Sequence, residues 1–211
     1  MEGLVFDMDG VLLLSRDAHA EAFRSVLEPL GVHDFNYDRF AGWRTPEVFR
    51  TVFAEHDIPH DEPMIARCSE AKSRRAREVL ASGGSVAPQC VPVIDQLSRK
   101  YRLALASSGS RASVQAFLDV TGLSPAFRSV LCGDDVVRAK PDPEIFLRSI
   151  EALQLPAEQC VVIEDAVSGV QAARRAGASV IGMNSGDPSQ LTDAGATAVV
   201  NSLEELAEIL G

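Results

Sequence analysis

Two aspartates near the N-terminus, Asp7 and Asp9, stand one residue apart, directly after the apolar residues 4–6 and before Gly10. Side chains two apart in an extended chain point to the same side, so these carboxylates should leave the end of a strand as a pair while Met8 points the other way. Two carboxylates in one small space repel each other unless a cation lies between them, and Mg²⁺, which prefers oxygen ligands, is the natural cation. Taken alone, Asp-x-Asp-Gly is more typical of a solvated turn, so its interpretation depends on the rest of the chain.

Hydroxyl groups follow a second apolar run. Ser107 and Ser108 come directly after residues 103–106 and precede a helix expected from near Arg111. Hydroxyls and free backbone N–H groups at a strand-to-helix turn can bind an anion, because the helix N-terminus carries partial positive charge. Serine is also an ordinary helix cap, so this feature alone is weak evidence for a phosphate site.

A lysine and two acids complete the set of candidate residues. Lys140 lies in a turn stiffened by Pro141 and Pro143, with Pro143 in the first turn of the next helix and Asp142 as its cap. A solvated lysine is the alternative interpretation.

Glu164 and Asp165 end the apolar run 160–163 and face two directions, so at most one points directly at a shared metal. We assign that direct role to Asp165. Capping of the helix expected near Val167 is the competing role for these acids.

Composition limits the partners and the compartment. The chain has 211 residues, 46% of them hydrophobic, and a formal net charge of -10, which repels a phosphate backbone, so we expect no nucleic-acid partner. The four cysteines show no C-x-x-C spacing, which disfavours a zinc or redox site and indicates reduced thiols in the cytoplasm. Glu2 stands where a signal peptide would be basic, and no apolar run is long enough to span a membrane. We expect a cytoplasmic monomer or weak homodimer with no membrane contact.

Short apolar runs alternate with helical patterns along most of the chain. The predicted strands are 4–6, 103–106, 130–132, 161–163, 180–183 and 198–200, and the later helices are 112–120, 144–153, 167–176 and 203–210. This alternation predicts an α/β fold with a Rossmann-like, doubly wound parallel sheet covered by helices on both faces. Such sheets bind ligands at the carboxyl ends of their strands, where the candidate residues lie.

The gap between the first two strands breaks this alternation. From about residue 16 to 81 the patterns indicate helices only, over 18–30, 46–56 and 64–80, and residues 82–85 are expected to form a flexible joint. We therefore predict an all-helical cap domain over 16–85, inserted into a core made of 1–15 and 86–211. One continuous mixed domain is the alternative.

Four motifs, taken together, resemble the haloacid dehalogenase superfamily in order and spacing. They are Asp7-Met8-Asp9-Gly10-Val11, Ser107 after an apolar strand, Lys140-Pro141-Asp142-Pro143, and Val162 to Val170, which contains Glu164-Asp165. The resemblance covers about the whole chain. Its helical cap after the first strand is similar to the branch that contains β-phosphoglucomutase and many small-molecule phosphatases, including those acting on phosphoglycolate.

The resemblance implies a phosphoric monoester hydrolase that depends on Mg²⁺. Asp7 is expected to attack phosphorus and form an aspartyl-phosphate, and Asp9 to protonate the leaving group and then activate water. Ser107 and Lys140 are expected to hold phosphoryl oxygens. Mg²⁺ is expected on Asp7, the Asp9 backbone carbonyl and Asp165, with Glu164 bound directly or through water. The haloacid dehalogenases themselves use no metal, so Asp9 and Asp165 favour a phosphotransfer member.

A phosphosugar mutase is the main alternative to a phosphatase. His19 matches a histidine of the mutases, but similar phosphatases carry one too. Where the mutases have a Ser-Lys pair and a cap Ser-Arg pair, this chain has Gly109-Ser110 and Arg44-Thr45. These departures weaken the binding of a second phosphate group, which a mutase needs. We therefore favour water as the final acceptor of the phosphoryl group.

Trp43, Arg44 and His19 are expected to contact a small phosphomonoester substrate from the cap. Cap packing and surface charge are the alternative roles of Trp43 and Arg44. The basic residues around Lys72 are interpreted as a solvated helix face.

Two other classes are disfavoured. A receiver domain has about 120 residues and no helical insert, and its nucleophile ends a middle strand. In a non-catalytic relic of the fold we would expect some of the catalytic side chains to be missing, and all of them are present.

Overall fold

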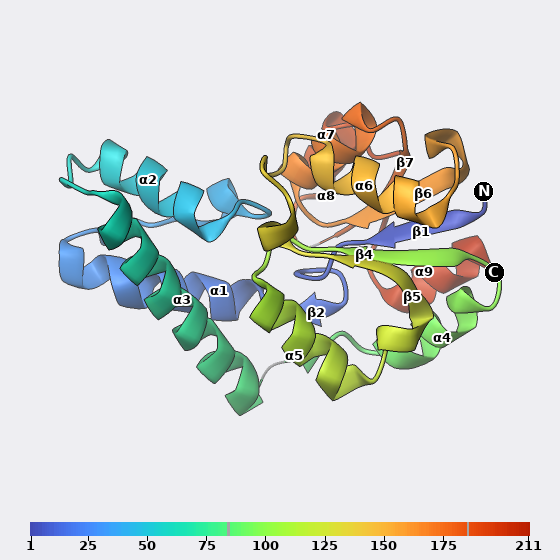
Figure 1. The fold of residues 1–211 in the computed structure, drawn as a ribbon, viewed down its shortest axis with the longest axis horizontal. Coiled ribbons are helices and arrows are strands. Elements are labelled where there is room, and N and C mark those ends of the chain that lie inside the picture. Colours follow the sequence, from blue (N-terminus) through green and yellow to red (C-terminus); the bar gives the residue numbers. More distant parts are fainter. Residues whose placement is uncertain (84, 185) are drawn as a thin grey trace.

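A six-stranded parallel sheet forms the centre of the protein. The computed structural model describes residues 1–83, 85–184 and 186–211. The strand order is β5-β4-β1-β6-β7-β8, so β1 with its two aspartates lies in the interior of the sheet (Figure 1). The strands are β1 (Gly3–Phe6), β4 (Arg102–Ala106), β5 (Phe127–Leu131), β6 (Cys160–Glu164), β7 (Ser179–Met183) and β8 (Ala198–Val200). Every predicted strand is present, within a few residues of its expected ends, and neighbouring strands pair in parallel.

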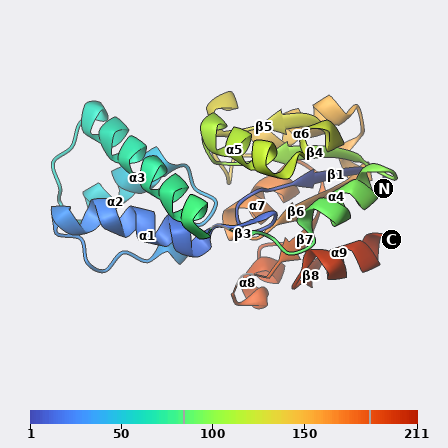
Figure 2. The same ribbon diagram turned by 90° about the horizontal axis from the view of Figure 1, so that it is seen from below.

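Helices cover both faces of this sheet, as predicted. Alternate residues of a strand face opposite sides, so Leu4 and Phe6 pack into one apolar cluster and Val5 into another. The first cluster includes α4 (Cys90–Ser98), α5 (Arg111–Thr121) and α9 (Leu203–Leu210), and the second includes α6 (Glu144–Leu153), α7 (Val167–Arg175) and α8 (Pro188–Asp193). Figure 2 shows α4 and α9 together near the two termini. The doubly wound architecture is confirmed.

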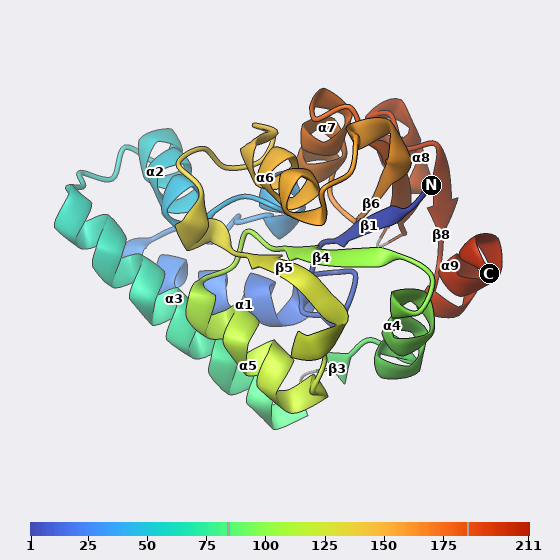
Figure 3. The same cartoon turned by 45° about the vertical axis from the view of Figure 1, so that its right-hand side comes forward.

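Three helices between β1 and β4 form the predicted helical insert. They are α1 (Arg16–Leu27), α2 (Thr45–Glu55) and α3 (Glu62–Gly83), with short 3-10 turns at Glu28–Leu30 and Tyr37–Phe40. They pack around their own aromatic cluster, which includes Phe23, Phe49 and Phe53. Figure 1 shows these helices to one side of the sheet, at the end away from both chain termini. In Figure 3, α3 passes close to α5, and residues of both helices line one cavity.

The connection between the insert and the core differs from the flexible joint predicted at residues 82–85. Helix α3 continues to Gly83, and β3 (Ser85–Val86) pairs antiparallel with β2 (Leu13–Leu14), while Gly84 lies outside the described residues. Main-chain hydrogen bonds, including Ala87 N–H to Leu12 C=O at 2.9 Å, therefore join the two chain segments that connect the core to the insert. We propose that the boundaries of the cap (16–85) and of the core (1–15 and 86–211) lie at this strand pair.

Two local details complete the fold. Helix α6 begins at Glu144, as predicted, but its N-cap is Pro143 and not Asp142. Asp142 accepts a hydrogen bond from Glu144 N–H at 3.0 Å. The remaining 3-10 turns are Ser124–Ala126, Gly133–Asp135 and Ala157–Gln159. In the described part of the chain, every helix is too short or too polar to cross a lipid bilayer.

Candidate active site

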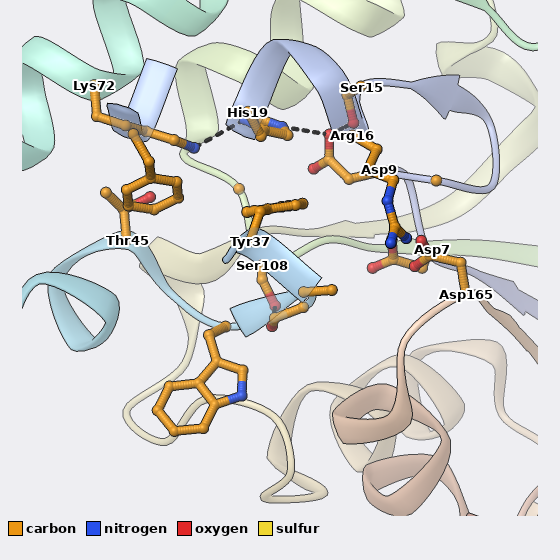
Figure 4. A pocket seen from close by; sticks show the side chains of 16 residues that line it. Asp7, Asp9, Ser15, Arg16, His19, Tyr37, Thr45, Lys72, Ser108 and Asp165 are labelled. Carbon is orange, nitrogen blue, oxygen red and sulfur yellow. Dashed lines mark hydrogen bonds and ion pairs between the residues drawn. The ribbon is translucent and has the colours of Figure 1, made fainter. Parts of the chain in front are cut away.

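Three aspartates meet at the carboxyl edge of the sheet. Asp7 follows β1, with its N–H bonded to Ile163 C=O at 3.0 Å, and Asp165 follows the neighbouring strand β6. Asp7, Asp9 and Asp165 all line one cavity between core and insert (Figure 4). Met8, between the first two, is buried in an apolar cluster of the core. The predicted pairing of Asp7 with Asp9 on one side of the chain is therefore present.

Lys140 is buried between two carboxylates. Its Nζ lies 2.5 Å from Asp7 Oδ1, 2.6 Å from Glu164 Oε1 and 3.3 Å from Ala106 O, and 4.8 Å from the Phe146 ring centroid. Burial would lower the pKa of Lys140, but the attraction of Asp7 and Glu164 outweighs it and raises the pKa above the usual value. Lys140 is thus a fixed positive charge beside Asp7, as predicted, and not a solvated lysine.

Asp7 is buried beside other acids, and Lys140 only partly offsets the effect of this environment. Burial raises the pKa of Asp7 to about 8; Lys140 opposes this effect, while Glu164 and Asp9 add to it. Burial, Glu164 and Asp7 likewise raise the pKa of Asp165 well above its usual value. The site therefore favours a further cation among these acids.

Asp9 is held by Ser15, at the end of the first core segment, and by polar side chains of the insert. Its Oδ1 accepts hydrogen bonds from Ser15 Oγ at 2.6 Å and His19 Nε2 at 2.9 Å, and His19 Nδ1 lies 2.8 Å from Lys72 Nζ (Figure 4). A protonated Lys72 can only donate, so His19 Nδ1 accepts its hydrogen bond. The hydrogen of His19 is then on Nε2, which donates a hydrogen bond to Asp9. Burial would raise the pKa of Asp9, but its interactions with His19, and then those with Ser15 and Lys72, lower it to about 2.

Lys72 differs from its interpretation as part of a solvated basic face. Its side chain is buried, with Nζ 4.6 Å from the Phe23 ring centroid, and burial lowers its pKa to about 8. Lys72 therefore belongs to the site, while Arg74, Arg75 and Arg77 of the same helix are exposed.

The predicted metal ligands form only part of a coordination shell. No three acidic, histidine or cysteine side chains of the described residues are arranged to hold a metal ion. Both Glu164 oxygens are engaged, Oε1 by Lys140 and Oε2 by Ala166 N–H at 2.8 Å. The Asp165 carboxylate packs so closely on Gly10 that a Cβ there would lie 1.9 Å from its Oδ2. Asp165 thus lies where it was expected, whereas Glu164 positions Lys140 and the start of α7.

The two serines after β4 have different surroundings. Ser107 is fully buried, and its Oγ accepts a hydrogen bond from Gly109 N–H at 2.9 Å. Ser108 lines the cavity, but its Oγ donates to Gly42 C=O of the insert at 2.8 Å. In this arrangement Ser108 joins the core to the insert.

Of the three residues of the insert that were expected to contact the substrate, two lie at the cavity and one does not. Trp43 lines the cavity and packs edge-on against Phe40, and His19 reaches Asp9. Arg44 does not line this cavity: its guanidinium donates to Gly133 C=O at 2.7 Å and Val137 C=O at 3.1 Å.

Five polar or charged residues of the cavity were not singled out for the site from the sequence. They are Ser15, Arg16, Tyr37, Thr45 and Lys72. Arg16 Nη2 forms an ion pair with Asp38 at 2.5 Å, and the Tyr37 ring lies beside His19 with 6.2 Å between centroids. The sequence pattern that indicates burial of Lys72 is its helical spacing from Ile65 and Ala76, because these three residues share the buried face of α3.

Comparison with known proteins extends these observations. A family model described as haloacid dehalogenase-like hydrolase matches residues 1–177. A phosphorylated carbohydrates phosphatase of Thermotoga maritima is 34% identical, with 100% of this chain and 98% of that protein covered. A fructose-1-phosphate phosphatase of Escherichia coli is 31% identical, with 85% and 94% covered.

A solved structure agrees with these relatives. The structure of CbbY from Rhodobacter sphaeroides in complex with phosphate has a TM-score of 0.79 and 28% identity, with 98% of this chain and 96% of that chain covered. The names of the two similar phosphatases agree with the predicted class of phosphoric monoester hydrolase. With the family model matching most of the chain, the protein belongs to the haloacid dehalogenase-like hydrolases, as its four motifs predict.

Proposed function

We propose that this protein is a Mg²⁺-dependent phosphatase that hydrolyses a small phosphomonoester, a phosphorylated sugar or a similar metabolite, through an aspartyl-phosphate on Asp7. The observation that carries the proposal is the buried contact of 2.5 Å between Asp7 Oδ1 and Lys140 Nζ, with Asp9 two residues away in the same cavity. A carboxylate becomes an effective nucleophile toward a phosphate only where positive charge offsets the repulsion between the two anions.

Lys140 and Ser107 are assigned to the phosphoryl oxygens. Lys140 is fixed by Asp7, Glu164 and Ala106 C=O, so its charge needs little reorganisation when a phosphate arrives. Ser107 lies at the end of the neighbouring strand β4, next to the loop residue Gly109 that lines the cavity. Positioning and charge neutralisation of this kind supply most of the acceleration in phosphoryl transfer.

Asp9 is assigned to proton transfer. With a pKa of about 2 it is ionised at neutral pH in this arrangement, which is the form that accepts a proton from the attacking water. To protonate the leaving oxygen first, Asp9 must gain a proton when the negative phosphate approaches. Ser15 and His19 hold the carboxylate in place through both steps.

The acids of the site fit a hard divalent cation. Asp7, the Asp9 backbone carbonyl and Asp165 would hold Mg²⁺, with Glu164 acting through water because both its oxygens are engaged. The raised pKa values of Asp7 and Asp165 support this assignment, because a cation would relieve their mutual repulsion. When bound, Mg²⁺ neutralises charge on the phosphoryl oxygens.

Phosphorylated sugars are the proposed substrates. Two similar proteins carry the names phosphorylated carbohydrates phosphatase and fructose-1-phosphate phosphatase. The polar groups of the cavity, His19, Tyr37, Thr45 and Lys72, suit the hydroxyls of such a leaving group, and Trp43 adds a flat apolar wall.

A mutase of the β-phosphoglucomutase kind is the second candidate. A putative β-phosphoglucomutase from Thermotoga maritima has 30% identity and a TM-score of 0.75 to this chain. Against a mutase, Arg44 is engaged by core carbonyls and Gly109-Ser110 supplies no lysine for a second phosphate.

Phosphate release from a panel of sugar phosphates, with Mg²⁺ and with chelator, tests the proposal. We expect metal-dependent release that the Asp7→Asn variant lacks. Conversion of β-glucose 1-phosphate to glucose 6-phosphate without release would establish the mutase instead.

A further inference from the structure

The cap segment 41–44 is bound at three separate places in the core. Ser108 Oγ donates to Gly42 C=O at 2.8 Å, and Ser168 Oγ, in the first turn of α7, donates to Ala41 C=O at 3.1 Å. The third contact is that of Arg44 with the segment between β5 and α6. Gly42 packs so closely that a Cβ would lie 2.6 Å from Ser168 Oγ. These contacts fix the insert over the cavity.

Arg44 supplies the charged donor among these hydrogen bonds. Its Nη2 donates to Gly133 C=O at 2.7 Å and its Nη1 to Val137 C=O at 3.1 Å. These partners are 89 and 93 residues away in sequence, so the bonds exist only while the insert lies against the core. Hydrogen bonds from a charged donor are about twice as strong as neutral ones. Trp43 and Thr45 line the cavity on either side of Arg44, which points out of it.

The segment that Arg44 binds leads directly to Lys140. Val137 N–H and Arg138 N–H each donate to the Glu144 carboxylate at 3.0 Å, so α6 holds the segment from the core side. Arg44 holds Val137 from the cap side, three residues before Lys140. Closure of the cap and placement of the Lys140 segment are therefore linked through one side chain.

We propose that Arg44 is a positioning residue, a latch that holds the cap closed and steadies the segment carrying Lys140, without contacting the substrate. The proposal rests on the proposed phosphatase function and assigns a specific role within it. It replaces the expected substrate contact of Arg44 with a contact between cap and core.

Substrates with different leaving groups separate a latch from a substrate contact. We expect Arg44→Ala to lower kcat/KM by a similar factor, about ten- to hundredfold, for sugar phosphates and for 4-nitrophenyl phosphate alike. Arg44→Lys keeps one charged donor and should recover part of the loss. Arg50→Ala is the matched control, because Arg50 also lies on α2 but pairs with Glu62 inside the cap, at 2.7 Å, and should behave as wild type. A loss confined to sugar phosphates would make Arg44 a substrate contact and overturn the latch.

Trp43 gives a readout that needs no turnover. It is the single tryptophan of the chain and lies next to Arg44. We expect acrylamide to quench its fluorescence more strongly in Arg44→Ala than in wild type or Arg50→Ala, with Arg44→Lys between them, because loss of the latch opens the cap. Thermal unfolding of each variant verifies that it is folded.

Equal quenching in wild type and in folded Arg44→Ala and Arg44→Lys would overturn the latch. If quenching responds while wild type releases no phosphate from any substrate, the latch is supported and the proposed function fails.

Discussion

The burial of Asp7 decides what this residue needs from its neighbours. Lys140 lies at 2.5 Å, yet burial and the acids Glu164 and Asp9 still raise the pKa of Asp7 to about 8. A nucleophilic carboxylate must be ionised, so at neutral pH Asp7 requires positive charge beyond that of Lys140. In the proposed function, a bound cation would supply that charge.

Replacement of the nucleophile tests this residue directly. We expect Asp7→Asn to lower kcat by about a thousandfold or more, because the amide cannot form the aspartyl-phosphate. Phosphate release and the circular dichroism of the folded protein are the measurements. Asp119→Asn is the matched control, since Asp119 is exposed on α5 and accepts a hydrogen bond from Gln115 of the same helix. Retained turnover in Asp7→Asn would remove Asp7 from the nucleophile's role.

Lys72 should make stability depend on pH. Burial lowers its pKa from 10.5 to about 8, so between these values the unfolded chain binds more protons than the folded protein. The free energy of unfolding should therefore rise with pH through this window, and the cost of burying the charge is fully present below about pH 8.

The Lys72→Met variant measures this cost. We expect the variant to be more stable than wild type at pH 7 by on the order of 1–2 kcal/mol, because removal of the buried charge outweighs loss of the hydrogen bond to His19. Its free energy of unfolding should not rise with pH through this window. Urea unfolding at several pH values gives the comparison. Parallel stability curves for the two proteins would mean that folding does not shift the pKa of Lys72.

Some site residues could be identified from the sequence and others could not. Asp7, Asp9, Lys140 and Asp165 stand in fixed spacing next to strand ends, so local order alone brings them to one edge of the sheet. The contact of Lys72 depends on how two helices of the insert pack together, and that of Arg44 on how the insert meets the core. Their partners are 53 residues away or more, and no local pattern encodes such contacts.

At the scale of elements, the turn after β1 places Gly10 against the end of β6. Gly10 has φ +82°, a conformation that side chains rarely adopt, and a Cβ there would lie 1.9 Å from Asp165 Oδ2. The turn therefore brings Asp9 and Asp165 together only if residue 10 is glycine.

A pair of glycine variants separates backbone strain from this close approach. Gly122, at the C-cap of α5, also has positive φ, at +70°, but nothing lies within 4 Å of its added Cβ. We expect both Gly10→Ala and Gly122→Ala to cost about 1 kcal/mol of stability from strain, and Gly10→Ala to cost more and to lose activity. Thermal unfolding and phosphate release measure both effects. Equal activity in the two variants would mean that Asp165 can move without consequence.

Strands and long helices were predictable because each carries a clear periodic pattern. The strand at 198–200 and the helices at 144–153 and 203–210 have the predicted bounds. The pair β2 and β3 was missed because two residues per strand are too few to show alternation, and only pairing between distant segments creates them. Helix α4 was missed as well, since its nine residues include Pro92 and follow Pro88.

At the scale of the whole molecule, an acidic chain places three of its aspartates in the cavity where its two parts meet. The net charge is -10, and Asp7, Asp9 and Asp165 line one cavity under the insert. Folding must bring these acids together against their repulsion. A cation that binds only the folded protein therefore stabilises the entire fold, beyond any role in the reaction.

Magnesium should consequently raise the stability of the whole protein. At about a hundredfold above its dissociation constant, a ligand specific for the folded state adds about 2.7 kcal/mol to the free energy of unfolding. Asp165→Asn removes one of the repelling carboxylates, so we expect this variant to be more stable than wild type in chelator but to gain little from Mg²⁺. Thermal unfolding of wild type and variant, each with chelator and with Mg²⁺, gives the four stabilities to be compared. If Mg²⁺ stabilised the variant as much as wild type, Asp165 would not be a ligand, and the cation would bind elsewhere on this acidic chain.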